Sequence, residues 1–186
     1  QLIREALDHG QTLLAENRAQ ELRDKAPLLA AHSPAPEWHF IGRLQKNKVK
    51  YVVPWASLIH TVDSFALAES ISQRAGGPIG VLIQVNTGGD ANKAGVPGTE
   101  ALALAKRVHG LEHLTVNGFM TIPPMTEQPE DCTPFFSEVK ELASQGRSDG
   151  LPTTVLSMGM SGDYRVAIRH GSTIVRIGTA IFGARD

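Results

Sequence analysis

The chain has 186 residues, of which 41% are hydrophobic and 20% charged, proportions that exclude a disordered or collagen-like protein. The 18 lysine and arginine residues nearly balance the 19 aspartate and glutamate residues, which leaves a net charge of −1 and excludes a general attraction to nucleic acid or an anionic membrane surface. No apolar run approaches the roughly 18 residues that suggest a membrane span. We therefore expect a globular protein that binds neither nucleic acid nor membrane.

The length fits one domain, which we expect to comprise residues 1–186. Cys132 is the single cysteine, so an intrachain disulfide and a cysteine-based zinc site are excluded, and the composition suits a reducing cytosol. No secretory signal pattern is present at the start. The chain begins at Gln1 with residues that read as a helix already under way, and we expect its natural amino terminus to lie upstream.

The first predicted element is a short amphipathic helix that ends at Gly10, a residue suited to a left-handed C-cap. Short apolar segments then alternate with helical segments, the pattern of βα units in a parallel sheet. Seven strands are predicted, at residues 11–15, 38–42, 58–62, 81–85, 116–121, 154–158 and 173–177. The predicted helices between them cover residues 17–31, 44–53, 64–75, 98–109, 133–144 and 163–169.

Seven strands preceded by a helix are one strand short of a (β/α)8 barrel, which has eight strands that are each followed by a helix. A strand placed before the first helix completes that order. We therefore predict a TIM barrel whose first strand is missing from this chain. The alternative is an open, doubly wound sheet, but the G-x-G-x-x-G turn typical of that fold is absent.

In a barrel, active residues follow the C-terminal ends of the strands, and phosphate groups bind after the last two. Residues 157–163 end one strand and begin a helix, with small residues that let backbone N–H groups approach an anion and with Ser161 as the expected N-cap. Gly178 and Thr179 follow the final strand and offer close backbone approach and a hydroxyl. These two segments predict a phosphate site, and tight turns without a ligand are the alternative.

Arg176 precedes Gly178 by two residues, so its side chain is predicted to point into the barrel mouth. A buried arginine needs a partner. That partner is either a carboxylate such as Asp63 or Asp163, in a structural ion pair, or a heteroatom of a ligand. The sequence alone leaves both open.

Other polar residues are less specific. Asn17 follows the first predicted strand and can cap the next helix or reach a ligand, and His39 lies on a strand where a core position is expected. His109 and His113 lack a third ligand, the remaining histidines form no cluster, and we expect no metal site. The basic run at residues 43–50 is most simply a solvated helix face. No Ser-His-Asp signature is present.

Six segments together resemble the pyridoxal phosphate homeostasis protein family. They are LAENRAQE (14–21), WHFIGRLQKNK (38–48), QVN with KAGV (84–86 and 93–96), GFMTIPP (118–124), LSMGMSGD (156–163) and RIGTAIFG (176–183). The resemblance runs from end to end and in the family's order. It implies a stand-alone barrel like the N-terminal domain of alanine racemase that carries pyridoxal 5′-phosphate and helps regulate its supply and amino-acid balance, without robust catalysis.

The resemblance also implies residue roles. Ser157, Gly178 and Thr179 would hold the phosphate, Arg176 would face the pyridine nitrogen, and Asn17 would lie near the ring. An arginine at that nitrogen disfavours its protonation, so the ring would be a weak electron sink. We expect no catalytic residues.

Two departures from the family are visible. Leu14 and Ala15 stand where the family has Phe-Gly. The family's Schiff-base lysine lies on the strand that precedes the first helix, and no lysine of this chain matches its motif, so we expect that lysine upstream.

Two other functions remain as alternatives. One is a pyridoxal phosphate-dependent amino-acid racemase, which needs acid/base groups on both faces of the substrate α-carbon. The other is an interaction module that uses the basic face at residues 43–50. For the preferred function we expect apo-enzymes that use the cofactor as partners, and a monomer.

Overall fold

The computed structural model describes residues 2–90 and 93–183. Its centre is a sheet of seven strands in which each strand pairs in parallel with the next along the chain. The strands are β1 (Leu13–Glu16), β2 (Glu37–Phe40), β3 (Ala56–Val62), β4 (Ile79–Val85), β5 (Leu114–Thr121), β6 (Val155–Met160) and β7 (Ile174–Arg176). All seven predicted strands are present, with boundaries that shift by at most two residues.

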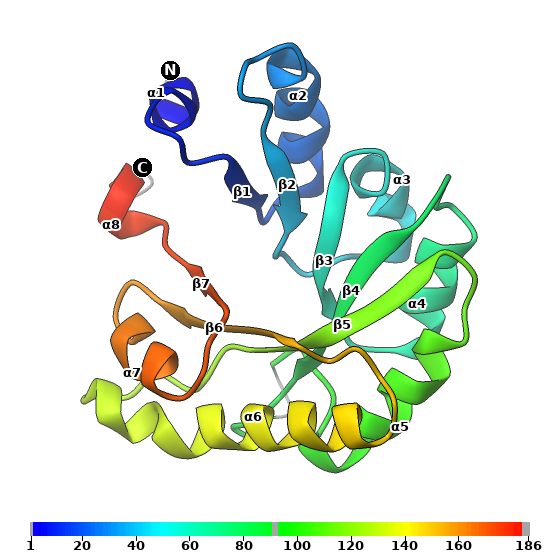
Figure 1. The fold of residues 1–186 in the computed structure, drawn as a ribbon, viewed down its shortest axis with the longest axis vertical. Helices are drawn as coiled ribbons and strands as arrows, with labels where there is room; N and C mark the ends of the chain where they lie inside the picture. Colours follow the sequence, from blue (N-terminus) through cyan, green and yellow to red (C-terminus); the bar gives the residue numbers. More distant parts are fainter. Residues whose placement is uncertain (1, 91–92, 184–186) are drawn as a thin grey trace.

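The sheet curls so that its two edges, β1 and β7, lie on the same side of the molecule (Figure 1). Sequential parallel order is the order of a barrel, whereas a doubly wound sheet reverses its strand order near the middle. The predicted TIM-barrel fold is therefore confirmed, in the form of seven strands that nearly close, and the open doubly wound alternative is wrong.

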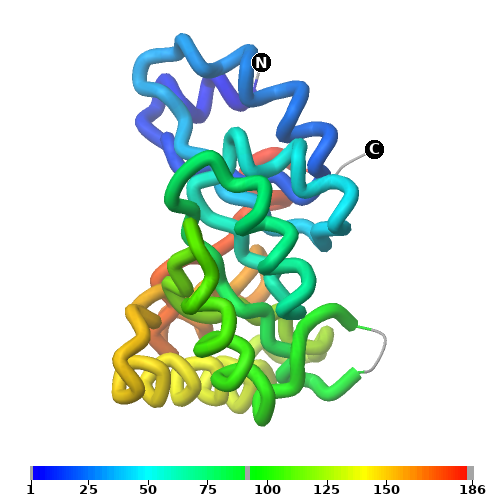
Figure 2. Tube along the Cα trace, turned by 90° about the vertical axis from the view of Figure 1, so that its right-hand side faces the viewer, coloured from blue at the N-terminus to red at the C-terminus, as the bar shows by residue number. Residues whose placement is uncertain are grey.

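Most of the helices cover the outer face of the curled sheet, and the last one buries no residue (Figure 1). The helices are α1 (Leu2–Asp8), α2 (Ala19–Leu29), α3 (Val49–Val52), α4 (Phe65–Ser72), α5 (Gly98–His109), α6 (Thr133–Ser148), α7 (Tyr164–Arg169) and α8 (Thr179–Phe182), with 3₁₀ turns η1 (Lys46–Lys48) and η2 (Pro129–Cys132). The predicted helix at 44–53 is split into η1 and α3, because its first turn winds more tightly, as helix N-termini often do. Figure 2 shows α2 at one end of the molecule and α6 at the other.

Local sequence explains where several helices begin and end. In α5 the buried residues Ala101, Leu104, Ala105 and Val108 repeat at helical spacing and pack towards β4 and β5. The Ser64 side chain accepts a hydrogen bond from Leu67 N and caps α4. After α1, Gly10 adopts a φ of 86°, the left-handed conformation expected of a C-cap glycine.

Two apolar cores result from the alternation of side chains along the strands. The larger core lies between the sheet and the helices and includes the fully buried Phe40, Phe119 and Phe136. Burial of each such side chain stabilises the fold by about 1.5–3 kcal/mol. A smaller cluster inside the curled sheet contains Leu58, Leu82 and Met120, with Val155 and Ile174 packed against it. Within the described residues, no helix combines the length and apolarity needed to cross a membrane.

Candidate functional site

A polar layer lies next to the inner apolar cluster, on its side towards the C-terminal ends of the strands. Strand side chains point to the same face every second residue. His60 therefore follows Leu58 on β3, Ser157 follows Val155 on β6, and Arg176 follows Ile174 on β7. The register of the parallel strands brings these three polar side chains together inside the barrel.

Arg176 joins three strands at this layer. Its Nη1 donates to Ser157 Oγ at 2.8 Å, and its Nη2 donates to the Thr121 carbonyl oxygen on β5, also at 2.8 Å. Burial lowers the pKa of the guanidinium to about 10, an effect that the Asp163 carboxylate partly offsets. Arg176, a half-buried residue, therefore remains a cation at neutral pH.

The partners of Arg176 are neutral. In the part of the chain that the structure describes, no ion pair connects it to Asp63 or Asp163, the two carboxylates considered from the sequence. Asp163 Oδ1 instead accepts from Met160 N at 2.6 Å. Burying a cation is costly without a counter-charge or further acceptors, and the two hydrogen bonds found for this guanidinium within residues 2–90 and 93–183 use two of its five N–H donors.

Two buried histidines extend the polar layer. His60 Nδ1 lies 2.8 Å from Ser157 Oγ, and His60 Nε2 lies 3.0 Å from His39 Nδ1. Burial sets the pKa of His60 well below its usual range, with additional repulsion from His39 and Arg176, and burial also lowers the pKa of His39. Both rings are therefore neutral at physiological pH.

The expectation that the remaining histidines form no cluster is wrong, because His60 contacts His39 directly. The residues are 21 positions apart, and only the pairing of β2 with β3 makes them neighbours. The inward alternation of His60 with Leu58 was the available signal in the sequence. His39 is buried, as expected of a core histidine, but the core it occupies is the polar layer.

The two segments predicted to bind phosphate also meet. Thr179 Oγ1, at the start of α8, donates to Ser161 Oγ in the turn after β6, at 3.1 Å. Gly178 is exposed, and among the described residues other than its two chain neighbours no atom lies within 4 Å of the position that a Cβ would take there. The hydroxyls of Ser161 and Thr179 therefore lie beside the exposed backbone of Gly178. Ser161 does not cap α7, since that helix begins at Tyr164 and Asp163 takes the N-cap position.

Ser157 and Asn17 have different surroundings. Ser157 is fully buried, and its hydroxyl contacts both Arg176 and His60 inside the barrel. Asn17 is exposed after β1, at the other edge of the sheet, and Arg18 rather than Asn17 is the N-cap residue of α2. The backbone of Asn17 lies against Gly42, where a Cβ would fall 1.9 Å from the Asn17 carbonyl oxygen. The phosphate and ring roles of these residues stay predictions.

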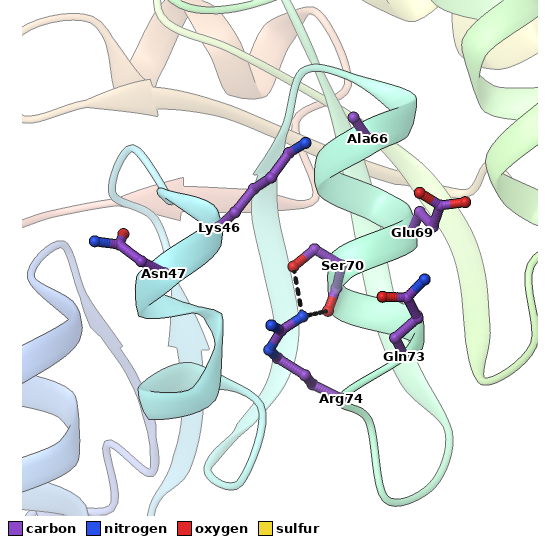
Figure 3. Close-up of a pocket in the computed structure, with 7 residues that line it drawn as sticks. All are labelled: Lys46, Asn47, Ala66, Glu69, Ser70, Gln73 and Arg74. Carbon is purple, nitrogen blue, oxygen red and sulfur yellow. Dashed lines mark hydrogen bonds between the residues drawn. The ribbon is translucent and has the colours of Figure 1, made fainter.

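The basic run contributes to a different place. Lys46 and Asn47 line an open groove of about 290 Å³ on the outer helix layer, opposite residues of α4 (Figure 3). On the α4 side, Arg74 Nη1 donates to Ser70 O and Ser70 Oγ. None of Asn17, Ser157, Arg176, Gly178 and Thr179 lines this groove. No group of three potential metal-ligating side chains was found among residues 2–90 and 93–183.

Comparison with known proteins gives the family. The family model described as alanine racemase, N-terminal domain, matches residues 1–186. A protein of Aquifex aeolicus named pyridoxal phosphate homeostasis protein is 44% identical over 100% of this chain and 82% of its own length. The chain belongs to the pyridoxal phosphate homeostasis protein family. A human protein of the same name is 36% identical, over 100% of this chain and 72% of its own length.

Solved structures agree with this family. PipY of Synechococcus elongatus with pyridoxal phosphate bound is 33% identical, with a TM-score of 0.87 over 97% of this chain and 86% of that one. An alanine racemase of Clostridium difficile, 15% identical, has a TM-score of 0.80 over 98% of this chain and 48% of that one. The second likeness shows the shared barrel fold alone.

Proposed function

We propose that this chain binds pyridoxal 5′-phosphate at the C-terminal mouth of the barrel and serves cofactor homeostasis and amino-acid balance. The observation that carries the proposal is Arg176, a half-buried cation whose hydrogen-bond partners are neutral. The names of its relatives and the cofactor-bound PipY structure support the same ligand.

The donors at the mouth fit the two ends of this cofactor. The Arg176 guanidinium is a permanent donor and suits the pyridine nitrogen, an acceptor. The hydroxyls of Ser161 and Thr179, with the open backbone at Gly178, suit the phosphate. Ser157 remains predicted for the phosphate as well, although its buried hydroxyl already holds Arg176. Asn17 is proposed to lie near the ring.

The cofactor, when bound, supplies an aldehyde that condenses with amines and a ring that withdraws electrons. Arg176 acts on the second property. Because a guanidinium donates a proton only with difficulty, it hydrogen-bonds the pyridine nitrogen without protonating it. The site therefore holds the ring in its weaker electron-withdrawing form, which favours storage of the cofactor over turnover.

We accordingly propose a carrier that delivers the cofactor to apo-enzymes in the cytoplasm, as a monomer and without robust catalysis. The racemase alternative requires a proton donor and acceptor on opposite faces of the substrate. Assay of D-alanine formation from L-alanine, with the cofactor present, separates the two functions. Sustained turnover would contradict the carrier function.

The binding proposal is tested by equilibrium titration of the chain with pyridoxal phosphate, followed by the cofactor's absorbance. We expect saturable binding. Excess inorganic phosphate should compete with the cofactor, and Arg176→Met should bind the cofactor more weakly. Arg165→Gln is the matched control, because Arg165 is an exposed arginine on α7. No saturable binding, or equal binding by Arg176→Met and the control, contradicts the proposal.

A further inference from the structure

The polar layer continues beyond His60 to a carboxylate at the start of β2. His39 Nε2 lies 3.5 Å from Glu37 Oε1, and the same oxygen accepts a hydrogen bond from Ser57 Oγ at 2.8 Å. A carboxylate only accepts hydrogen bonds. The contact between His39 and Glu37 is long for a hydrogen bond, but the negative charge of Glu37 favours the ring N–H of the neutral His39 on the near nitrogen, Nε2, which leaves His39 Nδ1 without a proton.

This assignment fixes the proton on each following group. Since His39 Nδ1 accepts, the contact of 3.0 Å requires His60 Nε2 to donate. A neutral imidazole carries one proton, so His60 Nδ1 accepts, and Ser157 donates its hydroxyl proton to it. Ser157 Oγ then offers its lone pairs to Arg176 Nη1. Every bond from Arg176 to His39 runs in one direction.

One-way polarity has a consequence for Arg176. A serine hydroxyl normally rotates and can point its proton at any acceptor nearby. Here His60 takes that proton, so a lone pair of Ser157 faces the guanidinium permanently. Hydrogen bonds that share one direction also polarise one another and strengthen the chain. Arg176 is thereby held by a fixed acceptor on β6 and by the Thr121 carbonyl on β5.

We propose that His60 is a positioning residue for Arg176, acting through Ser157, and that His39 and Glu37 set its tautomer. The effect on the ligand rests on the proposed function, because it assumes that Arg176 faces the pyridine nitrogen. The effect on the protons does not, because it concerns the chain without any ligand.

The first test is therefore made on the chain alone. Nitrogen-15 NMR of the ring nitrogens, at pH 7.5, distinguishes the two neutral tautomers. We expect the proton on Nε2 in both His39 and His60, and slow rotation of the Arg176 guanidinium. A proton on His60 Nδ1, or a charged His60 at this pH, overturns the proposal whether or not the cofactor binds.

The second test compares two substitutions of His60. His60→Asn keeps an acceptor near the position of Nδ1, whereas His60→Leu removes it. We expect His60→Leu to release the rotation of the Arg176 guanidinium and to weaken pyridoxal phosphate binding by about threefold to tenfold, the range of one ordinary hydrogen bond. His60→Asn is expected to restore both readouts to within about twofold of the original chain.

Control variants distinguish a loss of Arg176 positioning from a loss of fold stability. His109→Gln changes an exposed histidine at the end of α5 and should match the original chain in both readouts. If His60→Leu does not fold, Ser157→Ala takes its place, because it removes the hydroxyl that links His60 to Arg176 and accepts from Arg176 Nη1. Equal guanidinium rotation in His60→Leu and His60→Asn overturns the proposal. If the unaltered chain binds no cofactor, the proposed function fails, while the tautomer and rotation measurements still decide the role of His60.

Discussion

His60 Nδ1 lies 2.8 Å from Ser157 Oγ, a contact between two buried residues that are 97 positions apart in the chain. It connects the histidine pair on β2 and β3 with the arginine that ends β7. The candidate site therefore extends across the inside of the barrel. We expect a substitution on one strand to change the contacts of site residues on another.

Arg176→Met is expected to weaken pyridoxal phosphate binding by about tenfold to a hundredfold, because hydrogen bonds to charged groups contribute about 1.5–3 kcal/mol. The free energy of unfolding should change by less than about 1 kcal/mol, since the lost bonds are offset by relief of the buried charge. Absorbance titration and urea unfolding measure the two quantities. Unchanged binding with a large loss of stability would show a structural arginine instead.

Ser161→Ala and Thr179→Val test the phosphate end of the site. Each removes one hydroxyl of the pair that lies 3.1 Å apart. We expect each to weaken pyridoxal phosphate binding by about threefold to tenfold and to leave the binding of pyridoxal, which has no phosphate, unchanged. Ser157→Ala should weaken both ligands, because it acts through Arg176. An equal effect of Ser161→Ala on both ligands would place the phosphate elsewhere.

Gly42→Ala is expected to destabilise the fold by about 1–3 kcal/mol, the usual cost of overpacking. The added Cβ would lie 1.9 Å from the Asn17 carbonyl oxygen, so the ends of β1 and β2 must separate. Gly76→Ala is the control, since among the described residues other than its chain neighbours no atom lies within 4 Å of its added Cβ. Urea unfolding measures the stability of both variants. Equal free energies of unfolding would mean that the backbone at Asn17 moves away from the added Cβ without loss of stability.

Stability should fall as the pH drops below the usual histidine pKa of 6.5. Burial lowers the pKa of His60 and His39 in the folded chain, so the unfolded chain takes up protons first as the solution is acidified. Each histidine contributes a slope of at most about 1.4 kcal/mol per pH unit, between the unfolded and folded pKa values. The stabilisation is fully present above pH 6.5 and lost below it.

Urea unfolding between about pH 7.5 and pH 5 measures that slope. His60→Asn is expected to reduce the slope relative to the original chain, because Asn does not titrate. His109→Gln is the control, since that histidine is exposed and lies outside the polar layer. A slope that is identical in all three chains would show that His60 is already protonated, or that it titrates alike in both states.

The sequence alone was sufficient for the order of the elements and for the mouth of the barrel. Alternating apolar segments predicted seven strands, because burial on both faces of a parallel strand leaves a local pattern. The segments at 157–163 and 176–179 predicted a meeting of two loops, because the rule for barrel mouths depends only on strand order. Motifs spread over the whole chain also identified the family.

Only the tertiary structure decided what Arg176, Ser157 and His60 contact. Whether Arg176 pairs with a carboxylate depends on distances between strands. The local sequence does not determine these distances. The contact of His39 with His60 follows from the register of β2 on β3, which sequence periodicity does not fix. The direction that we propose for the hydrogen bonds rests on the neighbours of each buried group, and these come from four different strands.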